Sequence, residues 1–140
     1  MKSAAECRAV CVPPVQVSEV LPLAQPMIRS AVSRCGDWTE AGIIAGLRKG
    51  DFLLWLAISG TDIDAAAVTE LLQSEATGRY CNIILCGGRR LGNWAHLKSA
   101  IEQYAIDEQC ARIRLSGRRG WARAFQDYRQ PYITLEKVLI

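Results

Sequence analysis

The sequence is poor in the residues that build metal centres. It holds a single histidine, His96, and its cysteines form no C-x-x-C pair, so a zinc site is not expected. The cysteines are Cys7, Cys11, Cys35, Cys81, Cys86 and Cys110. We predict that they are reduced and metal-free, because scattered free cysteines behave as small buried hydrophobes. Strict alternation along a strand also predicts that Cys81 and Cys86 face opposite sides of it.

Long apolar runs are missing as well. The longest stretch without a charge, "FLLWLAISGT", has about ten residues, whereas a membrane-spanning helix needs about 20. The first residues, "MKSAAECRAV", also lack the apolar core of a signal peptide. We therefore expect no membrane segment and a cytosolic protein.

What is present is typical of one globular domain, spanning residues 1–140. Half of the 140 residues are apolar and 22% are charged. The charge is uneven: residues 1–78 hold 6 Lys/Arg against 9 Asp/Glu, and residues 79–140 hold 11 against 5. We expect the second half to face an anion, which charge alone does not identify as a nucleotide cofactor, a nucleic acid or an acidic protein.

Hydrophobic periodicity predicts an α/β chain throughout. The first helix is expected to begin at an N-cap, Ser18, and to run to Cys35. The other predicted helices cover 39–48, 93–108 and 118–128, and the predicted strands cover 8–14, 51–59, 64–72, 79–86, 111–117 and 132–140. The helix over 93–108 carries an apolar stripe made of Trp94, Leu97, Ile101, Tyr104 and Ala105.

This order of elements resembles the GCN5-related N-acetyltransferase family. The resemblance is most specific over "NIILCGGRRLGNWAHLKSAIEQYAIDEQCARIRLSG", where strand, loop, helix and strand follow at the family's lengths. The stretch "GRRGWARAFQDYRQPYITLEK" is similar to small acetyltransferase-like proteins of phages and prophages. The resemblance implies an α/β fold of the family type, with a mixed central sheet and helices on both faces.

The resemblance also implies a loop that offers backbone amides to the pyrophosphate of acetyl-CoA. Trp94 stands where the family's loop pattern has Gly or Ala, and an indole there can keep the backbone away from the phosphates. Arg89 and Gly92 match the first arginine and the central glycine of the pattern. Our candidate cofactor-binding residues are Gly87, Gly88, Arg89, Arg90, Gly92 and Asn93.

Catalytic groups are implied by the same resemblance. The family commonly uses a carboxylate near the splayed strands as base, and a tyrosine in a later helix as acid. Glu70 is our candidate base, with Asp62 and Asp64 as substitutes, and Tyr128 is our candidate acid. In the competing interpretation the three carboxylates are solvated surface charges. Tyr128 then lies in the core, on the same helical face as Trp121 and Phe125.

A nucleic-acid interface is a further hypothesis, because arginines interleaved with an aromatic can bind phosphates and stack on bases. The cluster consists of Arg112, Arg114, Arg118, Arg119, Arg123 and Trp121. Nucleic acid is nevertheless not our expected partner. Arg112 and Arg114 alternate with apolar residues, which explains them as the outer face of a strand.

Taken together, these departures from the family pattern favour a non-catalytic protein without a cofactor. We expect a phage virion component, structural or internal, made in the bacterial cytoplasm and then packaged. Its partners would be portal, tail or internal virion proteins, or further copies of itself. The alternative is an acetyl-CoA-dependent N-acetyltransferase.

Overall fold

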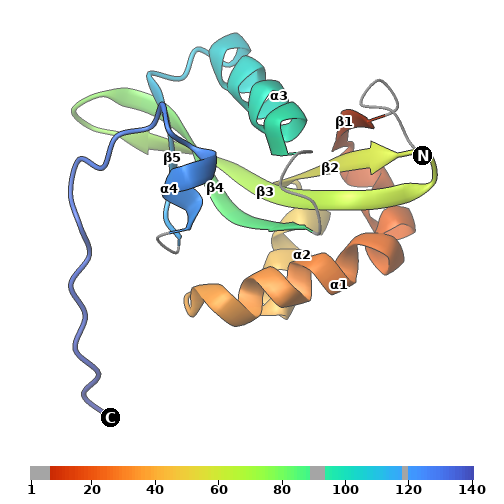
Figure 1. The fold of residues 1–140 in the computed structure, drawn as a ribbon, viewed down its shortest axis with the longest axis horizontal. Coiled ribbons are helices and arrows are strands. Elements are labelled where there is room, and N and C mark those ends of the chain that lie inside the picture. The colour runs from red at the N-terminus through yellow and green to blue at the C-terminus, as the bar shows by residue number, and fades with distance from the viewer. Residues whose placement is uncertain (1–6, 89–93, 118–119) are drawn as a thin grey trace.

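A computed structural model describes residues 7–88, 94–117 and 120–140 (Figure 1). They form one mixed sheet with helices on both of its faces, as the sequence predicts (Figure 1). The strands are β1 (Cys7–Val12), β2 (Leu53–Ser59), β3 (Asp62–Ser74), β4 (Gly78–Gly88) and β5 (Arg112–Leu115). The helices are η2 (Pro14–Gln16), α1 (Val17–Cys35), α2 (Glu40–Lys49), α3 (Trp94–Asp107) and α4 (Trp121–Ala124).

The strands lie in chain order, β1-β2-β3-β4-β5. The first four are antiparallel neighbours, whereas β5 runs parallel to β4 after the crossover through α3. The β4–β5 ladder is short and runs only from the pair Tyr80 and Arg112 to the pair Ile83 and Leu115. β4 therefore extends beyond its parallel neighbour.

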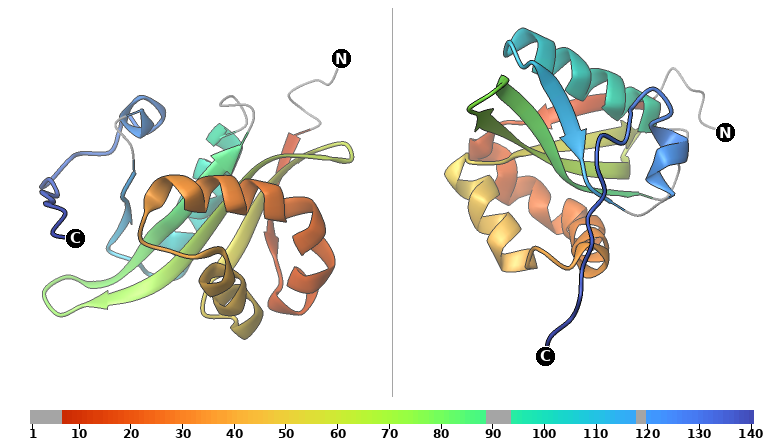
Figure 2. Two further views of the ribbon diagram at one scale, coloured as in Figure 1. Left: turned by 90° about the horizontal axis from the view of Figure 1, so that it is seen from below. Right: turned by 90° about the vertical axis from the view of Figure 1, so that its left-hand side faces the viewer.

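Two apolar layers hold the helices to the sheet. α1 and α2 cover one face and α3 covers the other (Figures 1 and 2). The predicted stripe of α3 is confirmed: Trp94, Leu97, Ile101 and Ala105 are buried against the sheet, and Tyr104 packs beside them. Each helix is thus positioned by one apolar face.

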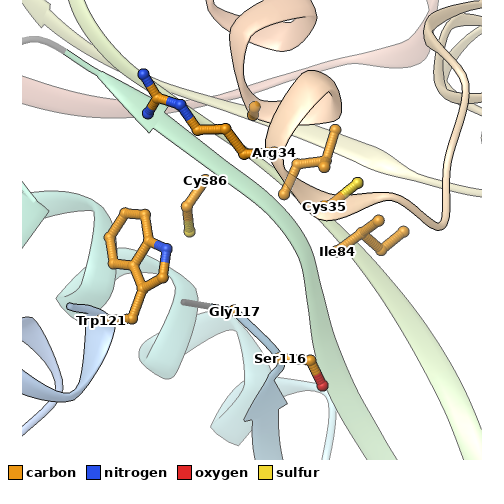
Figure 3. Close-up of a pocket in the computed structure, with 9 residues that line it drawn as sticks. Arg34, Cys35, Ile84, Cys86, Ser116, Gly117 and Trp121 are labelled. Atoms are coloured by element: carbon orange, nitrogen blue, oxygen red, sulfur yellow. The ribbon is translucent and has the colours of Figure 1, made fainter. Parts of the chain in front are cut away.

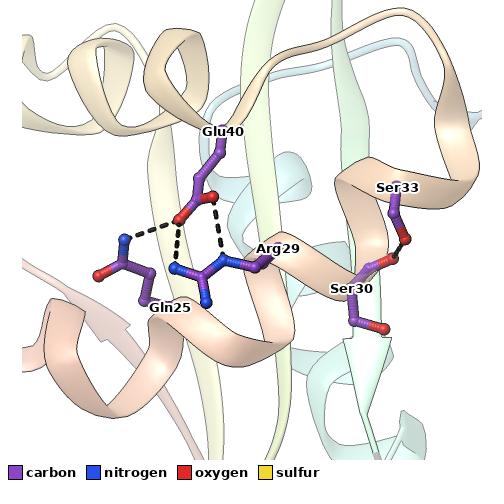
Figure 4. A network of polar contacts seen from close by, with 5 residues as sticks. All are labelled: Gln25, Arg29, Ser30, Ser33 and Glu40. Atoms are coloured by element: carbon purple, nitrogen blue, oxygen red, sulfur yellow. Dashed lines mark hydrogen bonds and ion pairs between the residues drawn. The ribbon is translucent and has the colours of Figure 1, made fainter.

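The connection from α1 to α2 is fixed by polar contacts. Thr39 caps α2, because its Oγ1 accepts a hydrogen bond from the Gly42 amide at 3.0 Å. The Glu40 carboxylate accepts hydrogen bonds from Gln25 Nε2 at 2.7 Å and from Arg29 at 3.1 and 3.2 Å (Figure 4). The prediction of a helix after Thr39 is confirmed.

A β-bulge in β4 overturns the expectation for two cysteines. Val68 pairs with Leu85 and Thr69 with Ile83, so Ile84 is an extra residue between them. The extra residue shifts the alternation by one position. As a result Cys81 and Cys86 both pack in the layer beneath α3 rather than on opposite faces.

The chain after β5 differs most from the sequence prediction. The helix expected over 118–128 is confined to Trp121–Ala124, and residues 132–140 form no strand. Alternating apolar residues favour a strand only where a neighbouring strand supplies hydrogen bonds. At the other end, α1 begins at Val17 after Gln16, without the side-chain cap expected from Ser18.

Within the described ranges, no helix combines the length and hydropathy that crossing a membrane requires. The same residues hold no group of three or more His, Cys, Asp or Glu side chains placed to bind a metal ion.

Candidate functional site

The most distinctive feature of the sheet is the place where β4 and β5 part. Their ladder ends at Ile83 and Leu115, yet β4 continues through residues 84–88, of which Ile84 is the bulge and 85–88 pair only with β3. We call the space between residues 84–88 and the end of β5, at Ser116 and Gly117, the β4–β5 fork. Along it, the edge of β4 that faces β5 offers backbone groups without a ladder partner among the described residues.

An indole lines the fork. Trp121 of α4 points toward Cys86 of β4 and lies close to Gly117 (Figure 3). Gly117 makes this approach possible, because a Cβ there would come within 2.6 Å of the Trp121 ring. The remaining pocket is about 40 Å³, which is room for water rather than for a cofactor arm.

Two further side chains of the fork were missed by the sequence analysis. Arg34, near the end of α1, is exposed and extends over the end of β4, with no acidic partner in the described part of the chain (Figure 3). Cys86 also lines the pocket, and its burial raises the pKa of the thiol, so the thiol stays protonated. Only the docking of α1 on β4 reveals Arg34, because nothing in its own helix marks it.

The two glycines of the predicted phosphate loop have packing roles. A Cβ at Gly87 would stand 3.0 Å from the Met27 carbonyl oxygen, so this glycine lets α1 approach β4. A Cβ at Gly88 would stand 2.7 Å from the Asp64 carbonyl oxygen on β3. The other predicted cofactor-binding residues, Arg89, Arg90, Gly92 and Asn93, lie outside the described residues.

Trp94 turns into the protein. Only 5% of its surface is exposed, and its ring meets the Trp121 ring edge-on at 5.2 Å between centroids. The indole is thus held in the core under α3. It is Trp121, rather than Trp94, that occupies the fork.

The candidate base lies on β3 beside the start of the fork. Glu70 pairs across the sheet with Asn82, whose Nδ2 donates to Glu70 Oε2 at 3.0 Å. Asn82 directly precedes Ile83, where the β4–β5 ladder ends. Glu70 also lines a second pocket of about 220 Å³ between the start of β2 and Tyr104 of α3.

The candidate acid lies elsewhere. The Tyr128 hydroxyl donates to Glu102 Oε2 at 2.8 Å, and its ring packs against Phe125 with centroids 5.0 Å apart. Burial, followed by the bond to Glu102, raises the pKa of Tyr128. Neither candidate catalytic residue lines the fork pocket: Glu70 lines the second pocket, and the Tyr128 hydroxyl is bonded to Glu102.

The remaining candidates are the substitute bases and the arginine cluster, and they lie at separate places in the fold. Asp62 begins β3, and Asp64 is buried at a bulge of β3 opposite β2. Arg112 and Arg114 both stack on Tyr80, each with its guanidinium carbon 5.0 Å from the ring centroid. Arg118 and Arg119 lie outside the described residues. Arg112 and Arg114 therefore lie on the outer face of β4 and β5, as expected for a strand face, whereas Arg123 lies on α4.

A mixed sheet whose parallel strands part at their carboxyl ends is the fold of the GCN5-related N-acetyltransferases, and the chain has this fold. An aminoglycoside acetyltransferase from an uncultured soil metagenomic sample superposes with a TM-score of 0.73 at 10% identity, over 98% of this chain and 99% of that one. A probable acetyltransferase gives 0.73 at 17% identity, over 95% and 98%. A GNAT family acetyltransferase from Staphylococcus aureus gives 0.67 at 15%, over 96% and 99%. No protein-family model and no curated protein matches the sequence.

Proposed function

We propose that this protein is an acetyl-CoA-dependent N-acetyltransferase that binds its cofactor at the β4–β5 fork. The observation that carries the proposal is the free edge of β4 along residues 84–88, where an extended acyl-pantetheine arm can pair as a strand would. Support comes from acetyltransferases that share the fold over nearly the whole chain. One solved relative in fold, from Clostridium acetobutylicum, is described as a predicted acetyltransferase with acetyl-CoA.

Different parts of the fork would contribute to cofactor binding in different ways. The backbone of residues 84–88 would pair with the amide groups of the arm. Arg34 would attract the phosphates at the mouth, because its cation has no acidic partner within the described residues. The pocket of about 40 Å³ is too small for the arm, so the Trp121 side chain would leave the fork when the cofactor enters. α4 permits this movement, since it has four residues, no side-chain cap and no buried side chain.

Glu70 remains our proposed base. Acetyl transfer joins the acceptor nitrogen to the carbonyl carbon while the carbon–sulfur bond of the thioester breaks. The ammonium form of the acceptor must first lose a proton. Glu70 lines the pocket beside Tyr104 and not the fork pocket, so water molecules between the two would carry this proton to it. After the attack the nitrogen loses its second proton to solvent, and the departing thiolate takes one up from solvent, because the Tyr128 hydroxyl is bonded to Glu102.

A second candidate is a non-catalytic protein on the same fold, as in a phage virion component. The observation that favours it is the small pocket left beside Trp121 in the fork, which neither Glu70 nor Tyr128 lines. On this hypothesis the fold and its surface matter, and the cofactor groups have drifted. Its partners would be other virion proteins.

Calorimetric titration with acetyl-CoA and with desulfo-CoA separates the two. We expect a dissociation constant in the micromolar range for the full chain, which corresponds to about 7–8 kcal/mol at the low micromolar end. Trp121→Ala should bind several-fold more tightly, because the indole no longer competes for the fork. Trp38→Ala is the matched control, since Trp38 packs on Phe52 away from the fork.

If neither the parent nor Trp121→Ala saturates at millimolar acetyl-CoA, the enzyme proposal is wrong and the non-catalytic one is favoured. If binding is tight, thiol release from acetyl-CoA with a panel of amines measures the transfer itself. Glu70→Gln should then lower kcat while leaving the dissociation constant of acetyl-CoA within about twofold, because Glu70 acts on the acceptor.

A further inference from the structure

On the side of α1 and α2, the described helices leave part of the sheet uncovered, where the β3–β4 hairpin extends past both of them (Figure 2, left). Arg112 and Arg114 of β5 point to this side, because the residue between them packs in the layer under α3. Tyr80 and Asn82 of β4 point to it for the same reason. Glu70 of β3 joins them, since its carboxylate is bonded to Asn82. None of the five belongs to either apolar layer, and we call them the open face.

Opposite charges stand at the two ends of one row of the open face. Glu70 pairs across the sheet with Asn82, and Asn82 pairs with Arg114. Asn82 Nδ2 donates to Glu70 Oε2 at 3.0 Å, which holds the carboxylate toward the middle strand. Two strand spacings separate the backbones of Glu70 and Arg114 by roughly 10 Å. A ligand with an ammonium group at one end and an oxyanion at the other is complementary to this row.

The two arginines are positioned but not neutralised. Each has its guanidinium carbon 5.0 Å from the centre of the Tyr80 ring, and that of Arg114 is also 5.3 Å from the Tyr132 ring. Neither arginine takes part in an ion pair among the described residues. The Nε of Arg112 is buried without a hydrogen-bond acceptor in the same part of the chain. Stacking occupies the planes of the guanidinium groups and leaves N–H donors for a carboxylate or a phosphate.

The row lies at the closed end of the β4–β5 fork. Asn82 and Arg114 form the strand pair directly before the one at which the fork begins. An acyl arm paired along residues 84–88 would have its thioester at this end, because its phosphates stay at the mouth. An amine held on the Glu70 side of Asn82 is therefore close to the thioester carbon.

We propose that the open face binds a zwitterion, an amine that carries a carboxylate or a phosphate, and that this ligand is the acetyl acceptor. The second part rests on the proposed function. The oxyanion accepts hydrogen bonds from Arg112 and Arg114, and the ammonium group faces Glu70. In the transfer, the nitrogen takes the acetyl group from the sulfur, which leaves as the thiol. One proton of the ammonium group is released to solvent in each turnover, and the oxyanion is unchanged.

Binding is tested first, without acetyl-CoA. The probes are γ-aminobutyrate, which has both charges, and butylamine and butyrate, which have one each. In nuclear magnetic resonance spectra of the isotope-labelled full chain, γ-aminobutyrate should shift the amides of residues 80–82 and 112–114 and bind several-fold more tightly than either relative. Arg114→Gln should weaken its binding about tenfold, as expected for a lost charge-assisted hydrogen bond. Arg8→Gln, an exposed arginine on β1, is the matched control. Arg112→Gln is a second variant that serves if Arg114→Gln fails to fold.

Transfer is tested next, by thiol release from acetyl-CoA. The parent should prefer γ-aminobutyrate over butylamine by about tenfold or more in kcat/KM. Arg114→Gln should lose this preference, and Arg8→Gln should keep it. Aminoethyl phosphate, compared with γ-aminobutyrate, shows whether the oxyanion is a phosphate or a carboxylate.

The outcomes separate this proposal from the acetyltransferase proposal. Equal binding of γ-aminobutyrate and butylamine, or no shifts at the open face, would overturn the zwitterion site. Equal losses for Arg114→Gln and Arg8→Gln would overturn it too, because net charge alone would then explain binding. Thiol release without a preference would overturn the acceptor assignment and leave the acetyltransferase standing. A parent that binds γ-aminobutyrate at the open face but no acetyl-CoA would refute the acetyltransferase and leave the zwitterion site.

Discussion

The indoles of Trp94 and Trp121 meet edge-on, with ring centroids 5.2 Å apart and planes at 85°. The first begins α3 and belongs to the buried layer under that helix, and the second packs against that layer and lines the β4–β5 fork. Their contact connects the core to the candidate cofactor site. Any displacement of Trp121 by a ligand would expose one side of Trp94, whereas loss of Trp94 would remove one of the two aromatic rings that Trp121 contacts.

The two tryptophans should differ in what they contribute to stability. Trp94→Ala removes a buried ring and leaves a cavity, at a cost of about 3–5 kcal/mol in the free energy of unfolding. Trp121 is only partly buried, so Trp121→Ala should cost roughly 1–3 kcal/mol. Urea unfolding followed by circular dichroism measures both. A larger loss for Trp121→Ala would place that indole, and not Trp94, in the core.

Stability should fall in alkaline solution because of a buried thiol. Burial, with smaller contributions from Cys110 and Glu70, raises the pKa of Cys81 from 9.0 to about 12. Above pH 9 the unfolded chain has released this proton while the folded chain keeps it, so folding becomes less favourable as the pH rises toward 12. One such group contributes a slope of at most about 1.4 kcal/mol per pH unit.

Cys81→Ala should flatten that slope. The measurement is urea unfolding at pH 8 and pH 10.5 in the presence of a reductant, comparing the change in the free energy of unfolding between parent and variant. Cys35→Ala, at the partly exposed end of α1, is the control and should keep the slope of the parent. Identical slopes for the parent and Cys81→Ala would contradict the prediction.

The hydrogen bonds of Glu40 predict that the stability of the protein changes in acid solution. The hydrogen bonds from Arg29 and Gln25 lower the pKa of Glu40 from its usual 4.5. The resulting stabilisation is present above that usual value and is lost as the pH falls through the lowered one. At pH 7, Glu40→Gln should therefore unfold at a slightly lower urea concentration than the parent. This gap between the two unfolding midpoints should close at pH 3 and in high salt. Glu75→Gln, in the exposed turn after β3, should show no such gap.

The sequence alone predicts those helices and strands whose packing partners lie beside them in the chain. The buried stripe from Trp94 to Ala105 and the strands from Leu53 to Gly88 follow from periodicity, since each side chain reports its own burial. The sequence did not reveal the bulge at Ile84, because a one-residue insertion changes which side chains face α3 without changing the composition of the strand. The prediction of a strand over 132–140 is wrong, because alternating apolar residues do not show whether a neighbouring strand edge is available for pairing.

The candidate site was less accessible to sequence reasoning than the fold. Gly87 and Gly88 appear as a phosphate-loop signal, yet each also has a packing reason that only contacts with α1 and β3 reveal. The fork depends on where the β4–β5 ladder ends, which is a property of register and not of composition. Trp121 packs beside Phe125 against the layer under α3, as expected. The sequence did not show that the same ring also lines the fork, where Gly117 leaves room for it.

The last prediction concerns Arg34 and depends on cofactor binding at the fork. Arg34→Gln should weaken acetyl-CoA binding about three- to fivefold at low salt, because an exposed cation contributes at most about 1 kcal/mol. The difference should shrink as salt is raised, since screening acts on solvent-exposed charges. Acetyl-pantetheine, which lacks the phosphates, should bind the parent and the variant alike. Arg48→Gln, an exposed arginine on α2, is the control. Equal losses for Arg34→Gln and Arg48→Gln would show that the whole charge of the protein attracts the cofactor and that Arg34 has no special place at the fork.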